Sequence, residues 1–351
     1  MTGRPLVSVT LVTYNSGRFI RRCLESALDQ RYPALEVIII DNASTDGTTD
    51  ILEHFEDRCT VVYNEENIGF AAAQNQAIAL SSGAWVLTLN PDVMLLPNFV
   101  ESLMQTAEVD PAAGTVCGKL LLVDASFEIP DKQQVDSTGI YFNPMLRHMD
   151  RGCLETYNGH YREHEYVFGA TAAAACYRRE MIEDISVDGE FFDSDFFAYR
   201  EDADVAWRAQ LLGWTCIYDP NAAAYHVRKL RPGMRRQLPS EINMHSVKNR
   251  FLMRIKNITP NLYARNFFPI TFRDLGVVAY CVAIEHSSLR AFYYLWRDLD
   301  SVLHKRKLIQ ARRRVDDAYM ASWFRFTPVS RPLEASVKRQ TDAQEVLSDR
   351  P

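Results

Sequence analysis

The first third of the chain alternates short apolar runs with amphipathic stretches. The apolar runs predict strands, and they cover residues 6–14, 35–41, 59–63, 84–90 and 115–123. Apolar residues at helical spacing predict helices between them, over residues 16–30, 45–57, 70–83 and 96–109, the third closed by Gly83. Continuously apolar strands separated by helices indicate an α/β fold with a mainly parallel sheet flanked by helices on both faces.

Polar side chains follow three of the predicted strands. Parallel sheets bind ligands outside the carboxyl ends of their strands, so we expect these side chains to share one rim. They are Tyr14, Asn15, Asp41, Asn42, Asn90 and Asp92. Asp92 comes directly after an Asn-Pro pair in "WVLTLNPDV" (85–93), which is explained by a simple turn as well as by a metal site.

The second half of the chain is less regular. Residues 125–166 are polar with scattered Tyr and His, and we interpret them as excursions or a flexible flap. A small-residue strand leading into a helix follows at 167–185, and helices that mix aromatic, Leu and Arg residues begin near residue 240. The last 20 or so residues are polar and predict disorder.

Charge is distributed unevenly along the 351 residues. Residues 228–314 hold 19 Lys and Arg against 5 Asp and Glu, a net charge of +14. Because the whole chain carries −6, the remainder carries −20. A basic segment of this kind can meet phosphates, nucleic acid or an anionic membrane surface.

The cysteines and the apolar runs bear on location. Seven scattered cysteines without a C-x-x-C pair argue against a disulfide framework or structural zinc. The opening "MTGRPLVSVT" does not resemble a signal peptide. The apolar run at 275–284 has about half the length that a membrane span requires. We therefore expect a cytoplasmic chain without a transmembrane anchor.

Three motifs and one histidine are candidates for chemistry. "DNASTDGT" (41–48) is either a capped helix start or a set of groups that bind a polar ring edge. "NIGFAAAQNQAI" (67–78) either packs closely on the sheet or offers helix N–H groups to phosphate. The acids of "YREDADVAWR" (199–208) either complement the helix dipole or include a desolvated general base. His226 in "AYHV" is a structural residue or a ligand.

The order of these motifs resembles that of the family 2 glycosyltransferases, which have the GT-A fold. The matching segments are "TYN", "IIIDNASTDGT", "NIGFAAAQNQAI", "LTLNPDV", "FFAYREDADVAWR" and a closing His. More narrowly, the chain resembles the rhamnosyltransferase-like branch, over roughly residues 6–230. The resemblance implies a catalytic domain at 1–235, with a nucleotide-sugar half at about 1–123 and an acceptor half at about 124–235. A helical, basic and aromatic region at 236–330 and a disordered tail at 331–351 would follow.

The resemblance also implies a donor site and a cation. An activated sugar nucleotide would lie across the rim, with Mg²⁺ or Mn²⁺ bridging its diphosphate. Asp92 matches the metal-binding carboxylate, His226 matches a late His near the diphosphate, and Asn90 departs from the family's first acid. The donor-binding residues implied are Thr13, Tyr14, Asn15, Asp41, Asn42, Asn67, Asn75 and Asn90.

For the reaction, the resemblance implies a single displacement with inversion at the anomeric carbon. Asp202 matches the catalytic base, and Glu201 and Arg208 would orient it or bind acceptor hydroxyls. The donor expected first is dTDP-L-rhamnose, and a UDP-sugar such as UDP-galactofuranose or UDP-GlcNAc is the alternative. A non-catalytic protein that binds nucleotide sugars, and a nucleotidyltransferase, remain as weaker hypotheses.

The C-terminal region leaves two interpretations open. It is either a helical subdomain with a solvated basic face or a patch that lies on a membrane. A membrane patch on the inner face of the plasma membrane would suit a glycan acceptor carried on a polyprenyl diphosphate. Nucleic acid is not expected as a partner, because the acidic body would repel it and no recognition module is present.

Overall fold

The computed structural model describes residues 3–228 and 238–333. It confirms the alternation of strands and helices in the first third of the chain. The strands are β1 (Val7–Thr13), β2 (Leu35–Asp41), β3 (Thr60–Tyr63), β4 (Trp85–Leu89), β5 (Val93–Leu95) and β6 (Ala113–Leu122). The helices are α1 (Ile20–Leu28), α2 (Thr48–Leu52), α3 (Phe70–Leu80) and α4 (Phe99–Ala107).

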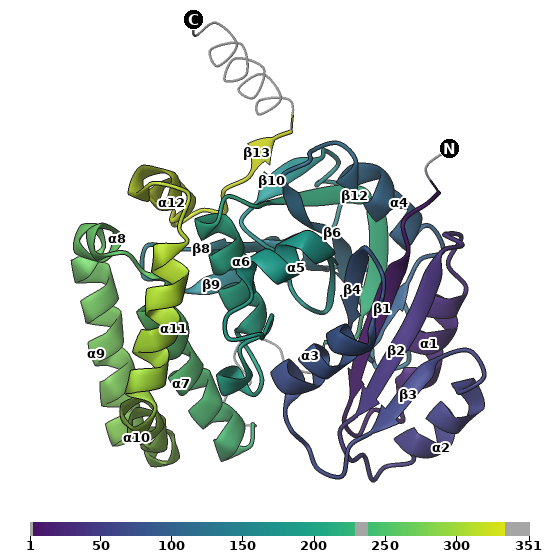
Figure 1. Ribbon diagram of the computed structural model, residues 1–351, viewed down its shortest axis with the longest axis horizontal. Helices are drawn as coiled ribbons and strands as arrows, with labels where there is room; N and C mark the ends of the chain where they lie inside the picture. The colour runs from purple at the N-terminus through teal and green to yellow at the C-terminus, as the bar shows by residue number, and fades with distance from the viewer. Residues whose placement is uncertain (1–2, 229–237, 334–351) are drawn as a thin grey trace, which may run out of the picture.

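These strands form part of a mixed, mostly parallel sheet (Figure 1). Later strands complete it: β10 (Glu165–Val167), β11 (Ala174–Arg178), β12 (Thr215–His226) and β13 (Arg331–Pro332). Along the sheet the order is β13-β10-β12-β6-β11-β4-β1-β2-β3. β1 pairs in parallel with β2 and β4, and β12 with β6, whereas β11 runs antiparallel between β4 and β6. The carboxyl ends of β1, β2, β4 and β12 therefore meet at one rim.

Side chains of β1 alternate between two layers of helices. Val9 and Leu11 belong to a buried cluster with α1 and α4, and Val12 belongs to one with Ala73 and Ala77 of α3. The helix α3 ends at Leu80 instead of Gly83. Gly83 serves a different purpose, because a Cβ there would lie 2.7 Å from the backbone nitrogen of Ser8 in β1. Its missing side chain allows the chain to approach the sheet.

Residues 125–166, which we interpreted as excursions or a flexible flap, contain short strands. The segment holds β7 (Val135–Ser137), β8 (Ile140–Phe142), β9 (His148–Asp150) and the strand β10. β7 pairs with β6, β10 pairs with β12, and β8 pairs with β9. Three residues are too few to show an apolar alternation in sequence, and contacts such as the 2.6 Å ion pair of Arg151 with Glu165 hold the segment in place.

The remaining helices follow the sheet. They are α5 (Arg179–Ile185), α6 (Glu201–Leu211), α7 (Ser240–Asn257), α8 (Pro260–Arg265), α9 (Phe267–Ala283), α10 (Arg290–Arg297), α11 (Leu299–Ala311) and α12 (Asp317–Trp323). Figure 1 shows α7 to α11 grouped beside α6, on the side away from β1–β3. No helix of the described chain is long and apolar enough to cross a membrane. The tail expected to be disordered begins with β13, and beyond residue 333 it lies outside the described residues.

Candidate active site

The loops after β1 and β2 form the first part of the rim. Asp41 is fully buried and accepts hydrogen bonds from the Thr13 hydroxyl at 2.6 Å and from both the hydroxyl and the N–H of Ser44. The Asn15 side chain accepts from the N–H of Thr45, with its own φ at 50°. The structure thus brings these predicted residues together through neutral groups and one carboxylate, while Tyr14 stays half exposed.

Asn42 is buried beside them, and its amide is already hydrogen-bonded. Its Nδ2 donates to the Gly69 carbonyl, and its Oδ1 accepts from Asn64. Asp41 and Asn42 therefore shape the rim through their side chains. The sequence expectation placed the same atoms on a nucleotide base, and the hydrogen bonds observed use them within the protein.

The segment at the start of α3 is tied to the far side of the site. Asn67 accepts from the N–H of Gly69, whose φ is +87°. A Cβ on Gly69 would meet the Phe197 ring at 2.6 Å, and the N–H of Ala71 donates to the Phe197 carbonyl. This hydrogen bond uses one of the N–H groups that the sequence assigned to phosphate. The contacts of Gly69 and Ala71 with Phe197 hold the loop before α6 against the start of α3.

The Asn75 side chain is hydrogen-bonded to the backbone of Phe192. Its Nδ2 donates to the Phe192 carbonyl at 2.6 Å, and its Oδ1 accepts from the Phe192 N–H at 2.9 Å. Both polar atoms of the amide are therefore used to hold the backbone of another loop. These two hydrogen bonds give Asn75 a structural role, and its place along a nucleotide stays a prediction.

Asp92 and His226 meet at the rim, as the sequence predicted. His226 is the last residue of β12 and pairs with Val93 of β5, which places its Nε2 3.3 Å from Asp92 Oδ1. Asn90 ends β4 in a turn, its carbonyl accepting from the Val93 N–H. The strand β12 continues through the Asp-Pro-Asn segment at 219–221, with a register irregularity there.

Asp136 of β7 is a member of the site that the sequence did not indicate. Its Oδ2 lies 2.7 Å from His226 Nδ1. Burial lowers the pKa of His226, but the charges and hydrogen bonds of Asp136 and Asp92 outweigh burial and raise it to about 10. The imidazole is therefore a cation between two carboxylates, and its Nε2 would have to lose a proton before it could bind a metal.

The described residues fit a cation only with help from a ligand. They contain no group of three or more His, Cys, Asp or Glu side chains that could hold a metal. Asp92 supplies one carboxylate, and His226 lies beside it. A hard divalent cation at Asp92 would therefore complete its shell with waters and with oxygens of a bound diphosphate.

A row of opposite charges continues from Asp136 toward α6. Arg228 donates to Asp136 at 2.7 Å and to Asp150 of β9 at 2.8 Å. Asp150 in turn acts on Asp202, because burial and then the negative charge of Asp150 raise the pKa of Asp202 to about 6. The candidate metal ligand and the candidate base thus stand at the two ends of one charged row. Arg228 and Asp150 gave no signal in the sequence.

Asp202 lies at the amino end of α6. Its Oδ1 accepts from the N–H of Ala203 at 2.7 Å, and its Oδ2 lies 3.4 Å from the N–H of Ala172. The side chain is half-buried, and its raised pKa is close to that of an effective general base at neutral pH. Ala172 lies in the stretch 167–185, which the sequence analysis predicts as a small-residue strand leading into a helix.

The two residues grouped with Asp202 behave differently from each other. Burial, and then the charge of Asp202, raise the pKa of Glu201 well above its usual range. The protonated form of Glu201 is therefore favoured beside Asp202. Arg208 is 1% exposed and donates to Asp204 at 2.8 Å and to two backbone carbonyls, of Ile185 and Phe191. Its guanidinium supports α6 from behind and does not reach acceptor hydroxyls, which corrects the expectation.

The loop that leads into α6 is strained and is held by α7. Phe197, Tyr199 and Arg200 all have φ between 62° and 74°, a region that non-glycine residues adopt at some cost. Asn249 of α7 is fully buried, and its Nδ2 lies 2.8 Å from each of three carbonyls, those of residues 196, 198 and 199. A helix of the C-terminal region therefore fixes the approach to Asp202.

Two lysines of the C-terminal helices extend this support. Lys256 of α7 forms ion pairs with Asp193 and Asp204. Lys305 of α11 forms ion pairs with Asp193 and Asp195, both at 2.7 Å. Burial raises the pKa of Asp193, but the two lysine charges outweigh it and lower the pKa well below the usual range. The sequence showed these lysines only as part of a basic segment.

Comparisons with known proteins show the family of the chain. The family model "Glycosyl transferase family 2" matches residues 8–185. TuaG of Bacillus subtilis, described as a teichuronic acid biosynthesis glycosyltransferase, is 46% identical over 92 residues, 25% of this chain and 36% of TuaG. The N-acetylglucosaminyl-diphospho-decaprenol L-rhamnosyltransferase of Mycobacterium tuberculosis is 25% identical over 63% of this chain and 76% of its own. The matches cover from about a third to just over half of the first curated relatives.

Solved structures share the fold. The mannosyltransferase PcManGT of Pyrobaculum calidifontis, solved with GDP-Man and Mn²⁺, superposes with a TM-score of 0.51 at 20% identity, over 91% of this chain and 86% of its own. GalNAc-T7 with UDP, GalNAc and Mn²⁺ gives 0.58 at 14% identity, over 73% of this chain and 48% of its own.

Proposed function

The chain belongs to glycosyl transferase family 2, and from that premise we propose that it transfers a sugar from a nucleoside diphosphate to a hydroxyl of a cell-surface glycan. The observation that carries the proposal is the half-buried Asp202 with its raised pKa, connected through a charged row to Asp92 on the same rim. A base and a site for the departing diphosphate are the two parts that such a transfer requires.

In the proposed reaction Asp202 takes the proton of the acceptor hydroxyl. The acceptor oxygen forms a bond to the anomeric carbon while the bond from that carbon to the phosphate oxygen breaks. The nucleoside diphosphate leaves with the electron pair. The configuration inverts because the two oxygens lie on opposite sides of the carbon, and no covalent enzyme intermediate is required.

We propose that Mg²⁺ or Mn²⁺ binds at Asp92 together with the donor. When bound, the cation stabilises the charge on the departing diphosphate. The contribution of this chain is to hold the Asp92 carboxylate at the rim and to keep His226 beside it, oriented by Asp136. Asn90 offers a neutral amide where the family has its first acid. We therefore expect weak metal affinity without donor and tighter affinity with it.

For the donor, we propose that the nucleoside lies against the loops after β1 and β2. Tyr14, Asn15 and the backbone beside Asp41 are its accessible groups. dTDP-L-rhamnose stays our first expectation because a rhamnosyltransferase is among the relatives. A UDP-sugar is the alternative, and the solved structures with UDP and GDP-Man show that this fold accepts other nucleotides. A non-catalytic binding protein would keep the rim without needing Asp202.

For the acceptor, we propose a glycan carried on a lipid diphosphate at the inner face of the plasma membrane. The M. tuberculosis relative is named for an acceptor of that class. The basic C-terminal region of this chain would bring the catalytic body to such a surface. The lipid-linked acceptor and the role of the basic region are proposals about the whole protein.

The test is Asp202→Asn, with Asp188→Asn as the matched control because Asp188 is exposed and, within the described chain, its ion pair is with His304 at 3.4 Å. Donor is offered as dTDP-, UDP- and GDP-sugars with Mn²⁺, and binding is followed by thermal shift. We expect Asp202→Asn to bind the preferred donor as the wild type does and to lose turnover at least about a hundredfold. Undiminished turnover would remove Asp202 as the base, and a wild type that binds donor but never turns it over would favour the binding protein.

A further inference from the structure

Helix α9 carries an apolar stripe on its outward face. Phe268 and Phe272 are each 82% exposed, and Leu275 and Val282 are more than half exposed. Their spacing of four, three and seven residues places them on one side of the helix. The opposite side packs inward through Ile270 and other buried residues. The stripe is therefore additional to the residues that hold the helix in the fold.

Helix α10 continues the apolar surface. Leu289, Tyr293 and Trp296 follow the same spacing, and Trp296 is 73% exposed. The rings of Tyr293 and Trp296 lie 6.4 Å apart. Both helices rest on α7, because Cys281 of α9 and Ala291 of α10 share one buried cluster with it. Figure 1 shows α9 and α10 along the outer edge of the molecule, away from the sheet.

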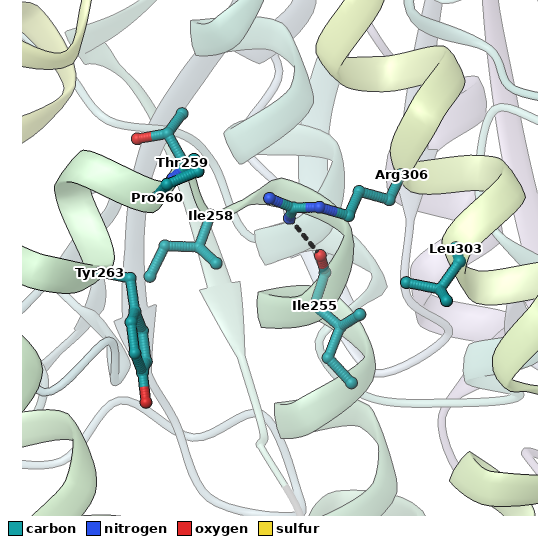
Figure 2. A pocket seen from close by; sticks show the side chains of 7 residues that line it. All are labelled: Ile255, Ile258, Thr259, Pro260, Tyr263, Leu303 and Arg306. Atoms are coloured by element: carbon teal, nitrogen blue, oxygen red, sulfur yellow. Dashed lines mark hydrogen bonds between the residues drawn. The ribbon is translucent and has the colours of Figure 1, made fainter.

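An apolar groove adjoins the stripe. Figure 2 shows the groove between the C-terminal end of α7, the helix α8 and the helix α11. Its volume is about 290 Å³. Tyr263 lines it, and the ring of Tyr263 meets that of Phe267, which meets that of Phe268, at 5.8 and 5.5 Å. Arg306 closes the groove with its guanidinium bound to the Ile255 carbonyl. The rings of Tyr263, Phe267 and Phe268 therefore connect the groove to the stripe.

The charge of this part of the chain indicates what covers the surface. The described residues 238–314 hold 14 Lys and Arg against 5 Asp and Glu, a net charge of +9, whereas residues 1–227 carry −19. Beside the stripe, Arg273 of α9 lies near Arg147, since burial and then the charge of Arg147 lower the pKa of Arg273. Two copies of so basic a region would repel each other. An anionic surface would attract this side of the molecule and repel the acidic body.

We propose that the outward face of α9 and α10 inserts into the headgroup layer of an anionic bilayer and holds the protein on it without crossing it. Phe and Leu side chains would enter the acyl boundary, and Tyr293 and Trp296 would lie at the interface. The purpose of this contact rests on the proposed function, because a lipid-linked acceptor would be presented there. The contact itself does not depend on which sugar is transferred.

The experiment compares the wild type with the double variant Phe268→Glu/Phe272→Glu. Both side chains are 82% exposed, so the change removes little packing beyond the ring contact of Phe268 with Phe267. The matched control is Phe326→Glu, another phenylalanine, 69% exposed and outside α9 and α10. The full chain is mixed with vesicles of phosphatidylcholine alone or with phosphatidylglycerol at low salt and sedimented. We expect the double variant to partition at least about tenfold less than the wild type and the control.

A second readout is tryptophan fluorescence. Trp296 is exposed, Trp214 is half-buried, and Trp85, Trp207 and Trp323 are buried. A blue shift on adding anionic vesicles that vanishes in Trp296→Phe therefore reports Trp296. Folded wild-type protein that stays with the supernatant overturns the proposal, as does a double variant that binds equally well. A wild-type dimer that the double variant makes monomeric would assign the face to a second copy. Donor cleavage in solution should be unchanged in the double variant, which separates this test from that of Asp202.

Discussion

The two sides of the rim are held together in different ways. On the side of β1 and β2, the contacts are short hydrogen bonds among neutral groups and one carboxylate, as between Thr13 and Asp41 at 2.6 Å. On the side of α6, they are ion pairs between distant parts of the chain, as between Lys256 and Asp193. The side that we propose for the donor is formed by neighbouring parallel strands, and the side that we propose for the acceptor is held by the C-terminal helices.

The difference has a physical consequence. A buried ion pair that loses one partner leaves a charge with less compensation. On the other side of the rim, Asp41 would keep two hydrogen bonds from Ser44 if it lost the one from Thr13. Substitutions on the acceptor side should therefore cost more stability. They should also affect catalysis while leaving donor binding intact, since the donor loops are built without them.

The largest effect is expected for Lys256→Met. Lys256 is 1% exposed and lies between Asp193 and Asp204, with its ammonium 4.7 Å from the Phe196 ring centre. Met fills a similar volume but removes the ammonium that the two carboxylates share. Asp193 keeps Lys305 and Asp204 keeps Arg208, so we expect a loss of about 3 kcal/mol in the free energy of unfolding. Urea denaturation measures it. Lys307→Met, at an exposed position of α11, is the control and should change stability by less than about 0.5 kcal/mol.

The next effect is expected for Asn249→Ala. Its amide donates to the carbonyls of residues 196, 198 and 199, which would be left without that donor. We expect a loss of about 1–3 kcal/mol and a fall in kcat, because the strained loop before Asp202 loses its support. Isothermal titration should show an unchanged donor Kd.

The control for this prediction is Asn261→Ala, which removes a contact with Asp317 at the surface. A fall in donor affinity as large as the fall in kcat would contradict the comparison, because it would mean that α7 supports both sides of the rim. Equal effects of Asn249→Ala and Asn261→Ala on kcat would show that the loop does not need Asn249.

The same comparison explains what could be predicted from the sequence. The strands β1, β2 and β4 and the rim residues after them follow from apolar runs and from the rule that ligands bind at carboxyl ends of parallel strands. Asp92 and His226 were placed together correctly because motif order carries that information. Their partner Asp136 lies in a three-residue strand, and nothing in "VDS" distinguishes its carboxylate from any surface acid.

Residues whose role depends on distant partners were placed less well. Arg208 and Asn75 stand in motifs that suggested ligand contacts, yet each hydrogen-bonds to backbone groups more than 15 positions away, and Arg208 also pairs with Asp204. Asn249 and Lys256 stand in a basic helix that suggested only a charged surface. Helical spacing shows which face of α7 is apolar, but it cannot show which polar groups that face meets.

A smaller effect is expected from pH. Asp202 has a pKa of about 6, raised by burial and then by Asp150. As the base must be deprotonated, kcat/KM should fall about tenfold per pH unit below 6. Stability should change in the opposite direction, because the folded state holds this proton more tightly than the unfolded chain, so stability falls as pH rises from about 4 to 6. Asp202→Asn should lose this part of the pH dependence of unfolding, and an unchanged profile would contradict the assignment.

The smallest effect is expected for Thr13→Val, on the donor side. Val keeps the shape of the fully buried side chain and removes the hydroxyl that donates to Asp41. Asp41 still accepts from the N–H and the hydroxyl of Ser44, so we expect a loss of only about 1 kcal/mol, read as a shift of the urea midpoint at constant m. The donor Kd should weaken more than kcat falls, the reverse of Asn249→Ala. A loss as large as that of Lys256→Met would mean that the neutral side of the rim depends on single contacts as strongly as the charged side does.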